Sequence, residues 1–148
     1  MPHSYTNLLY HFVFATKDRL PLLTSKIRPR LYEYLGGTVR GLDGTALEIG
    51  GIEDHIHLLA KLRQDIAVAE FIKKLKSNSS RWVRRTLRKD FGWQEGYGGF
   101  TVSESQMERV RQYIRNQEEH HRRVSFEEEF KALLRAHHID YEEDYLWR

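Results

Sequence analysis

The stretch LEIGGIEDHIHLLAKL, residues 47–62, predicts two strands joined by a tight turn. Apolar residues at 46, 47 and 49 indicate the first strand, and the largely apolar run from 55 to 62 indicates the second. The glycines at 50 and 51 and the aspartate at 54 are typical turn residues. We therefore predict a β-hairpin at this point, and the neighbouring segments extend the fold from it in both directions.

Hydrophobic periodicity on either side of the hairpin predicts the other elements. In chain order we expect a strand over residues 5–16, a helix from Ile27 behind a Thr24 or Ser25 cap that ends near 36–41, the hairpin, a long amphipathic helix from an Asp65 cap to about 91–92, a strand over 97–103, a helix from Ser105 that continues through His121, and a last helix over 125–136. The order β-α-β-β-α-β followed by helices is the split βαβ, or ferredoxin-like, pattern. The predicted class is α+β, a ferredoxin-like sandwich with an antiparallel sheet and additional C-terminal helices.

Length and composition bound the class of protein. A chain of 148 residues with 40% hydrophobic residues can form its own core, so we expect a single domain over residues 1–148. No apolar run reaches the roughly 18 residues that a membrane-spanning helix needs, and His3, Asn7 and His11 interrupt any signal-like segment. We therefore expect a cytoplasmic protein that neither crosses a membrane nor is secreted.

The chain contains no cysteine, which limits the chemistry available to it. Disulfide scaffolds, thiolate zinc sites and cysteine nucleophiles are all excluded. Any metal must be held by histidine, carboxylate, amide or water ligands. The sequence also contains no glycine-rich phosphate-binding loop, so we expect no nucleotide cofactor.

The net charge of +3 is modest but unevenly distributed. Residues 61–90 contain ten Lys or Arg residues against three acidic residues, whereas residues 118–148 contain five against nine. A basic helix is most often a solvated helix face, and an anionic partner such as nucleic acid is the main alternative. The candidate DNA contacts on the long helix are Lys73, Lys74, Lys76, Arg81, Arg84, Arg85 and Arg88. Several of them spread around the helix and are expected to face water.

Side-chain alternation in the second hairpin strand places His55 and His57 next to each other on one face. Two imidazoles so placed can converge on one cation, although two histidines that simply tolerate a strand are more common, and a divalent site usually needs a third protein ligand. Tyr113 and Gln117 lie four residues apart on one face of the predicted helix, but a tyrosine at helical spacing is usually a core residue. The residues that follow, through His121, are typical of a solvated helix end. Neither pair identifies a site by itself.

Taken together, the motifs resemble those of one protein family. They are Asp54-His55-Ile56-His57-Leu58-Leu59, Tyr113-Ile114-Arg115-Asn116-Gln117 with His120-His121, Ser125-Phe126 with Glu129, Tyr10-His11, Thr16-Lys17, and Tyr145-Leu146-Trp147. In this order and spacing they closely resemble the HUH single-tyrosine transposases of the insertion-sequence 200/605 family, including REP-associated tyrosine transposases. The resemblance extends over nearly the whole chain.

The resemblance implies a metal-dependent nuclease and strand transferase that acts on single-stranded DNA with hairpin ends. It implies that His55 and His57 coordinate a divalent cation, magnesium or manganese, and that Gln117 supplies the third ligand. Tyr113, on the C-terminal helices, would be the nucleophile, and its attack would leave a 5′-phosphotyrosine and a free 3′-hydroxyl. Asp54 would assist the metal or only shape the turn.

The resemblance also implies a homodimer. In this family the helix that carries the tyrosine often completes the active site of the partner subunit. The sequence leaves open whether Tyr113 acts in cis or in trans.

Other functions remain open from the sequence alone. The chain can be a domesticated relative that processes repetitive hairpin DNA, or a non-catalytic nucleic-acid-binding module of ferredoxin-like fold. A replication initiator or plasmid relaxase would share the chemistry but is usually longer. A metal-dependent hydrolase that uses His55, His57 and an acid would turn over without a covalent adduct.

Overall fold

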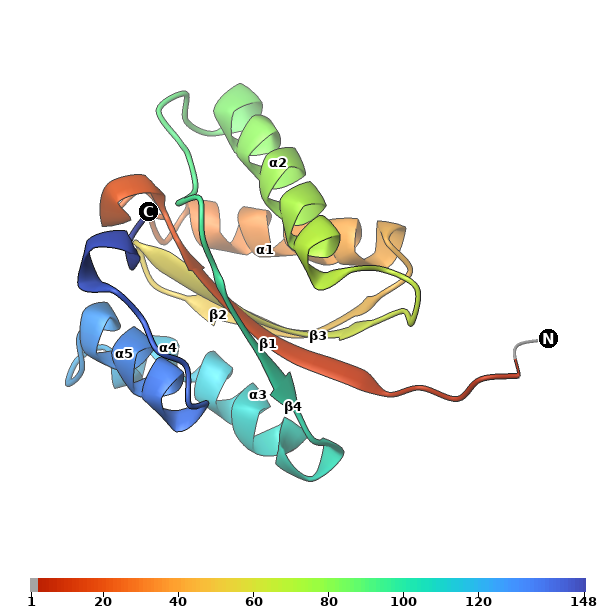
Figure 1. Cartoon of the computed structure of the whole chain (residues 1–148). Helices are drawn as coiled ribbons and strands as arrows, with labels where there is room; N and C mark the ends of the chain where they lie inside the picture. The colour runs from red at the N-terminus through yellow and green to blue at the C-terminus, as the bar shows by residue number, and fades with distance from the viewer. Residues whose placement is uncertain (1–2) are drawn as a thin grey trace.

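The chain folds around a four-stranded sheet in the order β2-β3-β1-β4, in which each neighbouring pair is antiparallel (Figure 1). The computed structural model describes residues 3–148, so the first two residues of the predicted domain lie outside the described part. The elements are β1 (Leu8–Ala15), η1 (Lys17–Arg19), α1 (Ile27–Gly41), β2 (Thr45–Gly51), β3 (His55–Leu62), α2 (Val68–Thr86), β4 (Gly98–Val102), η2 (Glu104–Gln106), α3 (Met107–Arg115), α4 (Gln117–His120), α5 (Phe126–Ala136) and η3 (Glu143–Tyr145). The predicted α+β, ferredoxin-like fold is confirmed.

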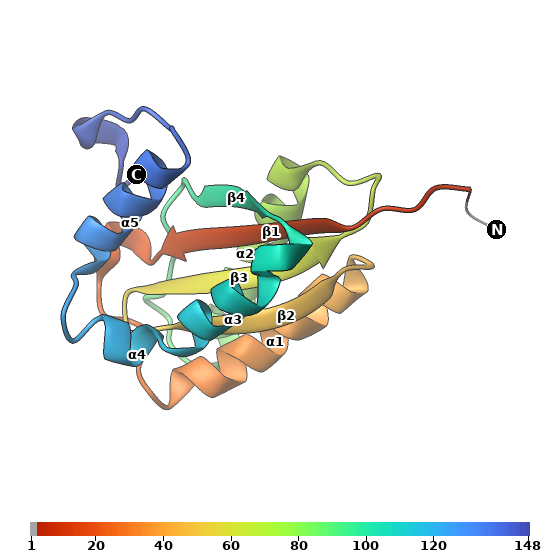
Figure 2. The ribbon, with the colours of Figure 1, turned by 90° about the horizontal axis from the view of Figure 1, so that it is seen from below.

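Helices cover both faces of the sheet (Figures 1 and 2). The helices α1 and α2 lie on one face, and α3, α4 and α5 lie on the other. The C-terminal helices therefore add a third layer to the two layers that the ferredoxin-like pattern requires. No helix within residues 3–148 is long and apolar enough to cross a membrane.

The main hydrophobic core lies between the sheet and the layer of α1 and α2. Phe12 of β1, Leu58 of β3, Leu35 of α1 and Leu75 of α2 are all fully buried there. The ring of Phe12 stacks on that of Phe71 with their centroids 5.5 Å apart. Burial of each large apolar side chain stabilises the fold by roughly 1.5–3 kcal/mol, so this layer holds the sheet in place.

A smaller apolar cluster lies on the opposite face of the sheet, beneath α5. Phe126 and Phe130 of α5 pack over Val13 of β1 and Phe100 of β4. The ring of Trp147 lies 5.6 Å from that of Phe126 and 5.7 Å from that of Phe130. The C-terminal tail and the sheet therefore hold α5 from both sides.

A close approach between β2 and α3 positions the next helical segment. A Cβ atom added to Gly50 would lie 2.3 Å from the carbonyl oxygen of Ile114, so only glycine fits beneath the helix. Ile114 is fully buried in this contact. Its neighbour Tyr113 and the first residue of α4, Gln117, are thereby held close to the sheet.

Several helix boundaries differ from the sequence prediction. The long helix ends at Thr86 and not near residues 91–92, and the residues before α1 and α3 are Lys26 and Gln106 in place of the predicted Thr24 or Ser25 and Ser105 caps. Asp65 does not cap the long helix, because α2 begins at Val68 and the Asp65 carboxylate pairs with Arg63 Nε at 2.9 Å. The helix predicted from Ser105 through His121 is interrupted at Asn116, whose φ of −97° and ψ of 24° are not helical. The interruption immediately precedes Gln117, which is buried against the sheet between exposed neighbours.

Candidate metal centre and active site

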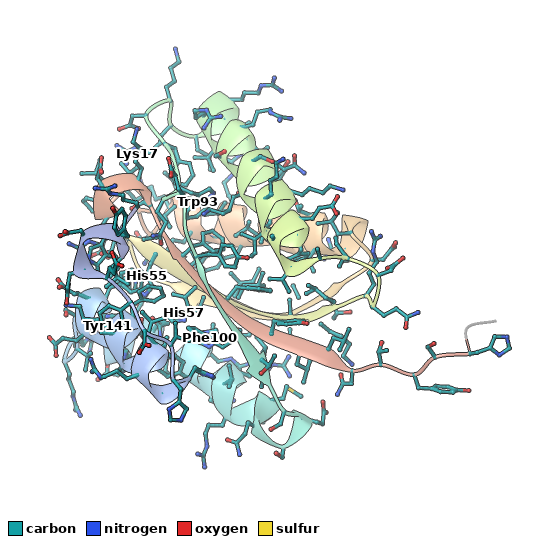
Figure 3. The ribbon with its side chains drawn as sticks, in the orientation of Figure 1. Lys17, His55, His57, Trp93, Phe100 and Tyr141 are labelled. Carbon is teal, nitrogen blue, oxygen red and sulfur yellow. The ribbon has the colours of Figure 1, made fainter. Side chains whose placement is uncertain are left out.

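The two histidines of β3 lie on the sheet face that α3, α4 and α5 cover (Figure 3). Both side chains are fully buried. His57 lies opposite Val13, and His55 lies opposite Ala15, so short side chains on β1 leave room beside the imidazoles. The prediction that the two imidazoles share one face is confirmed.

A contact at Nδ1 orients each of the two imidazoles. His55 Nδ1 lies 2.8 Å from Asp54 Oδ1, and His57 Nδ1 lies 2.8 Å from His11 Nε2. With both Nδ1 atoms engaged, the two Nε2 atoms face a common interior space. Asp54 touches the ring nitrogen that faces away from this space, which is the position of an orienting partner.

The carboxylate of Glu129, from α5, reaches into the space between the imidazoles. Its Oε1 atom lies 3.3 Å from His55 Nε2, 2.9 Å from His57 Nε2 and 3.2 Å from His121 Nε2. Glu129 is only 3% exposed. One ligand atom from each of these four residues lies within 4.8 Å of the others, a spacing that can accept one metal ion.

Gln117, the ligand that the resemblance predicts, reaches the same space from the start of α4. Its Oε1 atom lies 3.1 Å from His55 Nε2 and 2.9 Å from His121 Nε2. Its amide nitrogen donates a hydrogen bond of 3.0 Å to Glu129 Oε2. Two oxygen donors, one amide and one carboxylate, therefore face the histidine nitrogens.

Tyr113 of α3 completes the cluster within the same chain. Its hydroxyl donates a hydrogen bond to Glu129 Oε2. The centroid of its ring lies 5.6 Å from that of His57 and 5.3 Å from that of His120. The predicted nucleophile and the predicted metal ligands thus meet in one place, although the helix between Tyr113 and Gln117 is interrupted.

Burial and the Glu129 carboxylate together set the protonation states of the cluster. Burial lowers the pKa of His57 to about 4, so this ring is neutral near pH 7. Burial by itself would raise the pKa of the Glu129 carboxyl. Its hydrogen bonds with His121, His55 and His57 have the larger effect and hold this pKa far below its usual range. Burial, with the charge of Glu129, raises the pKa of Tyr113, which is therefore a neutral phenol.

The donor set fits a divalent cation bound by nitrogen and oxygen. Neutral imidazole and ionised carboxylate are the forms that bind metals, and both are present here. Carboxylate and amide oxygens suit magnesium and manganese, and imidazole nitrogens favour transition metals over magnesium. The group of His55, His57, His121 and Glu129, with Gln117 beside it, is therefore suited to hold a divalent metal.

The basic residues of the long helix are not brought to this site. All of them except Arg88, which follows the helix, lie on α2, which covers the opposite face of the sheet (Figure 1). Lys74 pairs with Glu70 at 3.2 Å, and Lys76 Nζ donates hydrogen bonds to the carbonyl oxygens of Glu95 and Gly96. DNA contacts through Lys73, Lys74, Lys76, Arg81, Arg84, Arg85 and Arg88 stay a prediction, and they would lie across the sheet from the histidines.

Sequence reasoning assigned no role to His11, His121 or Glu129. The expectation of a solvated helix end is wrong for His121, whose side chain is only 4% exposed. A signal existed for Glu129, because it lies between Phe126 and Phe130 in the apolar stripe of an amphipathic helix. For His11 the sequence offered only its place in the Tyr10-His11 motif, because its contact with the histidine pair depends on the register between β1 and β3.

Comparison with known proteins places this geometry in a family. Residues 4–117 match the family model described as Transposase IS200 like. Among curated proteins, the chain is similar to the ISDra2 transposase TnpA of Deinococcus radiodurans, with 29% identity over 119 residues that cover 74% of this chain and 84% of that protein.

Two solved structures share the fold. A Deinococcus radiodurans R1 protein described as a transposase candidate superposes with a TM-score of 0.66 and 25% identity, over 79% of this chain and 95% of that one. A REP-associated tyrosine transposase bound to a REP hairpin superposes with a TM-score of 0.58 and 13% identity, over 78% of this chain and 70% of that one. At that identity the second likeness concerns the fold alone.

The family match covers much of the site described above. It includes His55, His57, Tyr113 and Gln117, whereas His121 and Glu129 follow its last matched residue. The matches support a role in DNA transposition, with DNA cleavage as the general activity. The chain belongs to the IS200-like transposase family.

Proposed function

We propose that this protein is a metal-dependent transposase that cleaves and rejoins single-stranded DNA through a 5′-phosphotyrosine at Tyr113. The proposal depends above all on one observation, which is that the Tyr113 hydroxyl joins His57 and Glu129 in a single buried cluster. A tyrosine that merely fills a core needs one hydrogen-bond partner. Buried imidazoles and a buried carboxylate around it are costly to the fold, and they are characteristic of a functional site.

We propose that His55 and His57 supply nitrogen ligands and that Gln117 and Glu129 supply oxygen ligands to a magnesium or manganese ion. The support is that these side chains direct their Nε2 and Oε1 atoms into one space. When bound, the cation would polarise the scissile phosphate, offset the charge on its oxygens and favour the phenolate form of a nearby tyrosine. The mixed donor set suits manganese at least as well as magnesium.

In the proposed reaction the Tyr113 hydroxyl oxygen attacks the scissile phosphorus. A bond forms between this oxygen and phosphorus, and the bond from phosphorus to the 3′ oxygen of the preceding nucleotide breaks. The hydrogen bond to Glu129 orients the phenol. The phenol proton passes to water as the new bond forms, because the lowered pKa of Glu129 makes this carboxylate a poor proton acceptor, and the departing 3′ oxygen takes up a proton. The phosphotyrosine conserves the energy of the broken phosphodiester, so a later 3′-hydroxyl can reverse the step without a nucleotide cofactor.

The geometry supports attack in cis. Tyr113 and His57 of one chain lie with their ring centroids 5.6 Å apart, so nucleophile and ligands do not require a second chain. A homodimer remains part of the proposal, but without exchange of the tyrosine. If a mixture of His57→Ala and Tyr113→Phe chains stays inactive, cis attack is supported, whereas recovered cleavage would indicate trans assembly.

We propose single-stranded DNA with hairpin ends as the substrate. The REP-associated neighbour was solved with a REP hairpin, and the shared fold makes a similar ligand reasonable for this chain. A domesticated relative that processes repetitive hairpins would use the same chemistry. Exposed basic residues of α2 would then bind phosphates away from the cleavage point, with an affinity that falls with salt.

The test of the proposed function is a covalent protein–DNA adduct. Labelled single-stranded oligonucleotides from the flanks of the gene are incubated with the protein and manganese or magnesium, and the products are separated on a denaturing gel. We expect a protease-sensitive shifted band that disappears with chelator and in Tyr113→Phe. Tyr145→Phe, at a residue that is 60% exposed, is the matched control and should form the adduct normally.

The same experiment distinguishes the alternatives. Tight, salt-sensitive binding without an adduct on any flanking oligonucleotide would favour a non-catalytic nucleic-acid-binding module. Metal-dependent turnover without an adduct would favour a hydrolase that activates water instead of tyrosine.

A further inference from the structure

A cavity lies next to Tyr113 and outside the histidine cluster. It has a volume of about 430 Å³, and its lining residues come from β4, from α3 and from the end of α5. His11 of β1 and Phe100 of β4 line it together with Tyr113, whereas none of the four proposed metal ligands does. Tyr113 therefore belongs to the cluster and also lines the cavity.

We propose that this cavity binds one nucleobase of the DNA, from a nucleotide that adjoins the cleaved phosphate. The inference rests on the proposed function and specifies how the substrate is held at that site. The position, the lining and the charge at the rim of the cavity each support it.

The position of the cavity follows from the attack geometry. The scissile phosphorus must come close to the Tyr113 hydroxyl, which places that phosphate at the boundary between the cluster and the cavity. A single sugar separates a base from its phosphate, so the base of an adjoining nucleotide is within reach. In a single strand the base has no pairing partner to lose, and turning it into a cavity costs little.

The lining suits a planar heteroaromatic ring. The exposed His137 stacks on Phe100 with their ring centroids 4.4 Å apart, which provides an aromatic surface at the cavity. Val110 of α3 and Leu133 of α5, both partly buried, add aliphatic surface. Aromatic and aliphatic walls of this kind bind unpaired bases by stacking. The exposed Gln106 also lines the cavity and offers an amide to the polar edge of a base.

Two cavities adjoin the active site, and the arginine at the one beside Tyr113 is the more available to bind a DNA phosphate. A cavity of about 400 Å³ beside Gln117 contains Arg28 and Arg115, but Glu118 pairs with the first at 3.0 Å and Glu48 with the second at 2.8 Å. Arg109, at the proposed base cavity, is exposed and forms no ion pair within residues 3–148. Its guanidinium can therefore meet the phosphate that accompanies the base.

The test measures binding without cleavage. The metal-free full-length protein is titrated with trinucleotides of each base, and the methyl resonances of Val110 and Leu133 are followed by NMR. A trimer of abasic residues, which has the same phosphates and no bases, is the matched ligand control. We expect base-containing trimers to shift both methyl groups and the abasic trimer to leave them in place.

Filling the cavity provides the matched variants. Val110→Trp should lower the affinity for the preferred trimer by at least about tenfold, the loss of one stacked base. Tyr145→Trp, at an exposed residue that lines a different cavity near the C-terminal end of the chain, should bind as the unmodified protein does. If Val110→Trp does not fold, Gln106→Trp at an exposed lining residue serves the same purpose.

Each outcome bears on the proposal. Equal methyl shifts with the abasic trimer, no shift with any trimer, or unchanged affinity in the filled variant would overturn it. Methyl shifts that follow protein concentration without nucleotide would assign the cavity to self-association and overturn it as well. The adduct assay is independent, because an adduct without base-dependent shifts removes only the base pocket, and base-dependent shifts without an adduct remove only the nuclease.

Discussion

The two faces of one sheet bury residues of opposite character. Toward α1 and α2, the strands β1 and β3 present side chains such as Phe12 and Leu58, which pack into a largely apolar core. Toward the C-terminal helices the same two strands present His11 and His57, and the buried carboxylate of Glu129 lies among them. Apolar burial stabilises a fold, whereas buried polar groups cost free energy unless they are paired. The first face therefore maintains the fold, and the second uses part of that stability to hold a reactive site.

The largest expected effect is a loss of stability from a substitution on the apolar face, with metal binding on the polar face unchanged. Phe12→Ala should lower the free energy of unfolding by about 3–5 kcal/mol, because it removes a fully buried ring that stacks on Phe71. Urea denaturation measures this change, and Phe12→Leu should cost clearly less. The protein that remains folded should bind manganese as well as the unmodified chain, and a parallel loss of metal affinity would show that the two faces are not independent.

The second prediction concerns the acid at the centre of the polar face. Glu129→Gln retains the shape of the side chain but removes its charge, and should weaken manganese binding by about 100-fold or more, since a direct ligand is lost. Titration calorimetry or manganese EPR measures the affinity. Glu128→Gln, at an exposed position on the same helix, is the control. If Glu129→Gln binds normally and Gln117→Leu does not, the amide is the ligand and Glu129 only positions Tyr113.

A smaller effect is expected from the residue that orients His57. His11→Phe keeps a buried ring but removes the Nε2 atom that lies 2.8 Å from His57 Nδ1. Loss of such an orienting partner typically weakens metal binding by about 10–100-fold, and we expect the same here. His137→Phe, at an exposed residue outside the cluster, should bind manganese normally. Unchanged affinity in His11→Phe would mean that the strand alone orients the imidazole.

The smallest expected effect is a pH dependence of the free energy of unfolding that comes from Lys76, on the apolar side of the sheet. Burial lowers the pKa of Lys76 from 10.5 to about 8. Between these two values the unfolded chain binds this proton more often than the folded chain, so the free energy of unfolding should rise as the pH rises through this window. Urea denaturation at pH 7.5 and pH 10 should show the rise in the unmodified chain and a smaller rise in Lys76→Met. An identical rise in both would contradict the prediction, and Lys74→Met, at an exposed residue, is the control.

The comparison also shows which site residues a sequence can reveal. Alternation within one strand places His55 and His57 on one face, and a spacing of four residues brings Tyr113 near Gln117. Only the resemblance to the transposases, however, marked these two pairs as site residues. Glu129 lay within reach of the same reasoning, because a carboxylate in the apolar stripe of α5 violates the pattern of an amphipathic helix. The basic residues of α2 were visible by composition, but composition carries no information about which face of the sheet they cover.

The sequence by itself determined the order of the elements, the α+β class and the two pairs of residues that resemble a transposase motif. The order and the class depend on hydrophobic periodicities of two and of about 3.6 residues, which are local properties of the chain, whereas the two pairs were recognised through the resemblance. The tertiary structure alone decided that His11 contacts His57, that His121 turns inward and that Glu129 lies among the imidazoles. Such contacts depend on strand register and on how α5 packs over the sheet, and these arise from the burial of surfaces that are distant in the chain.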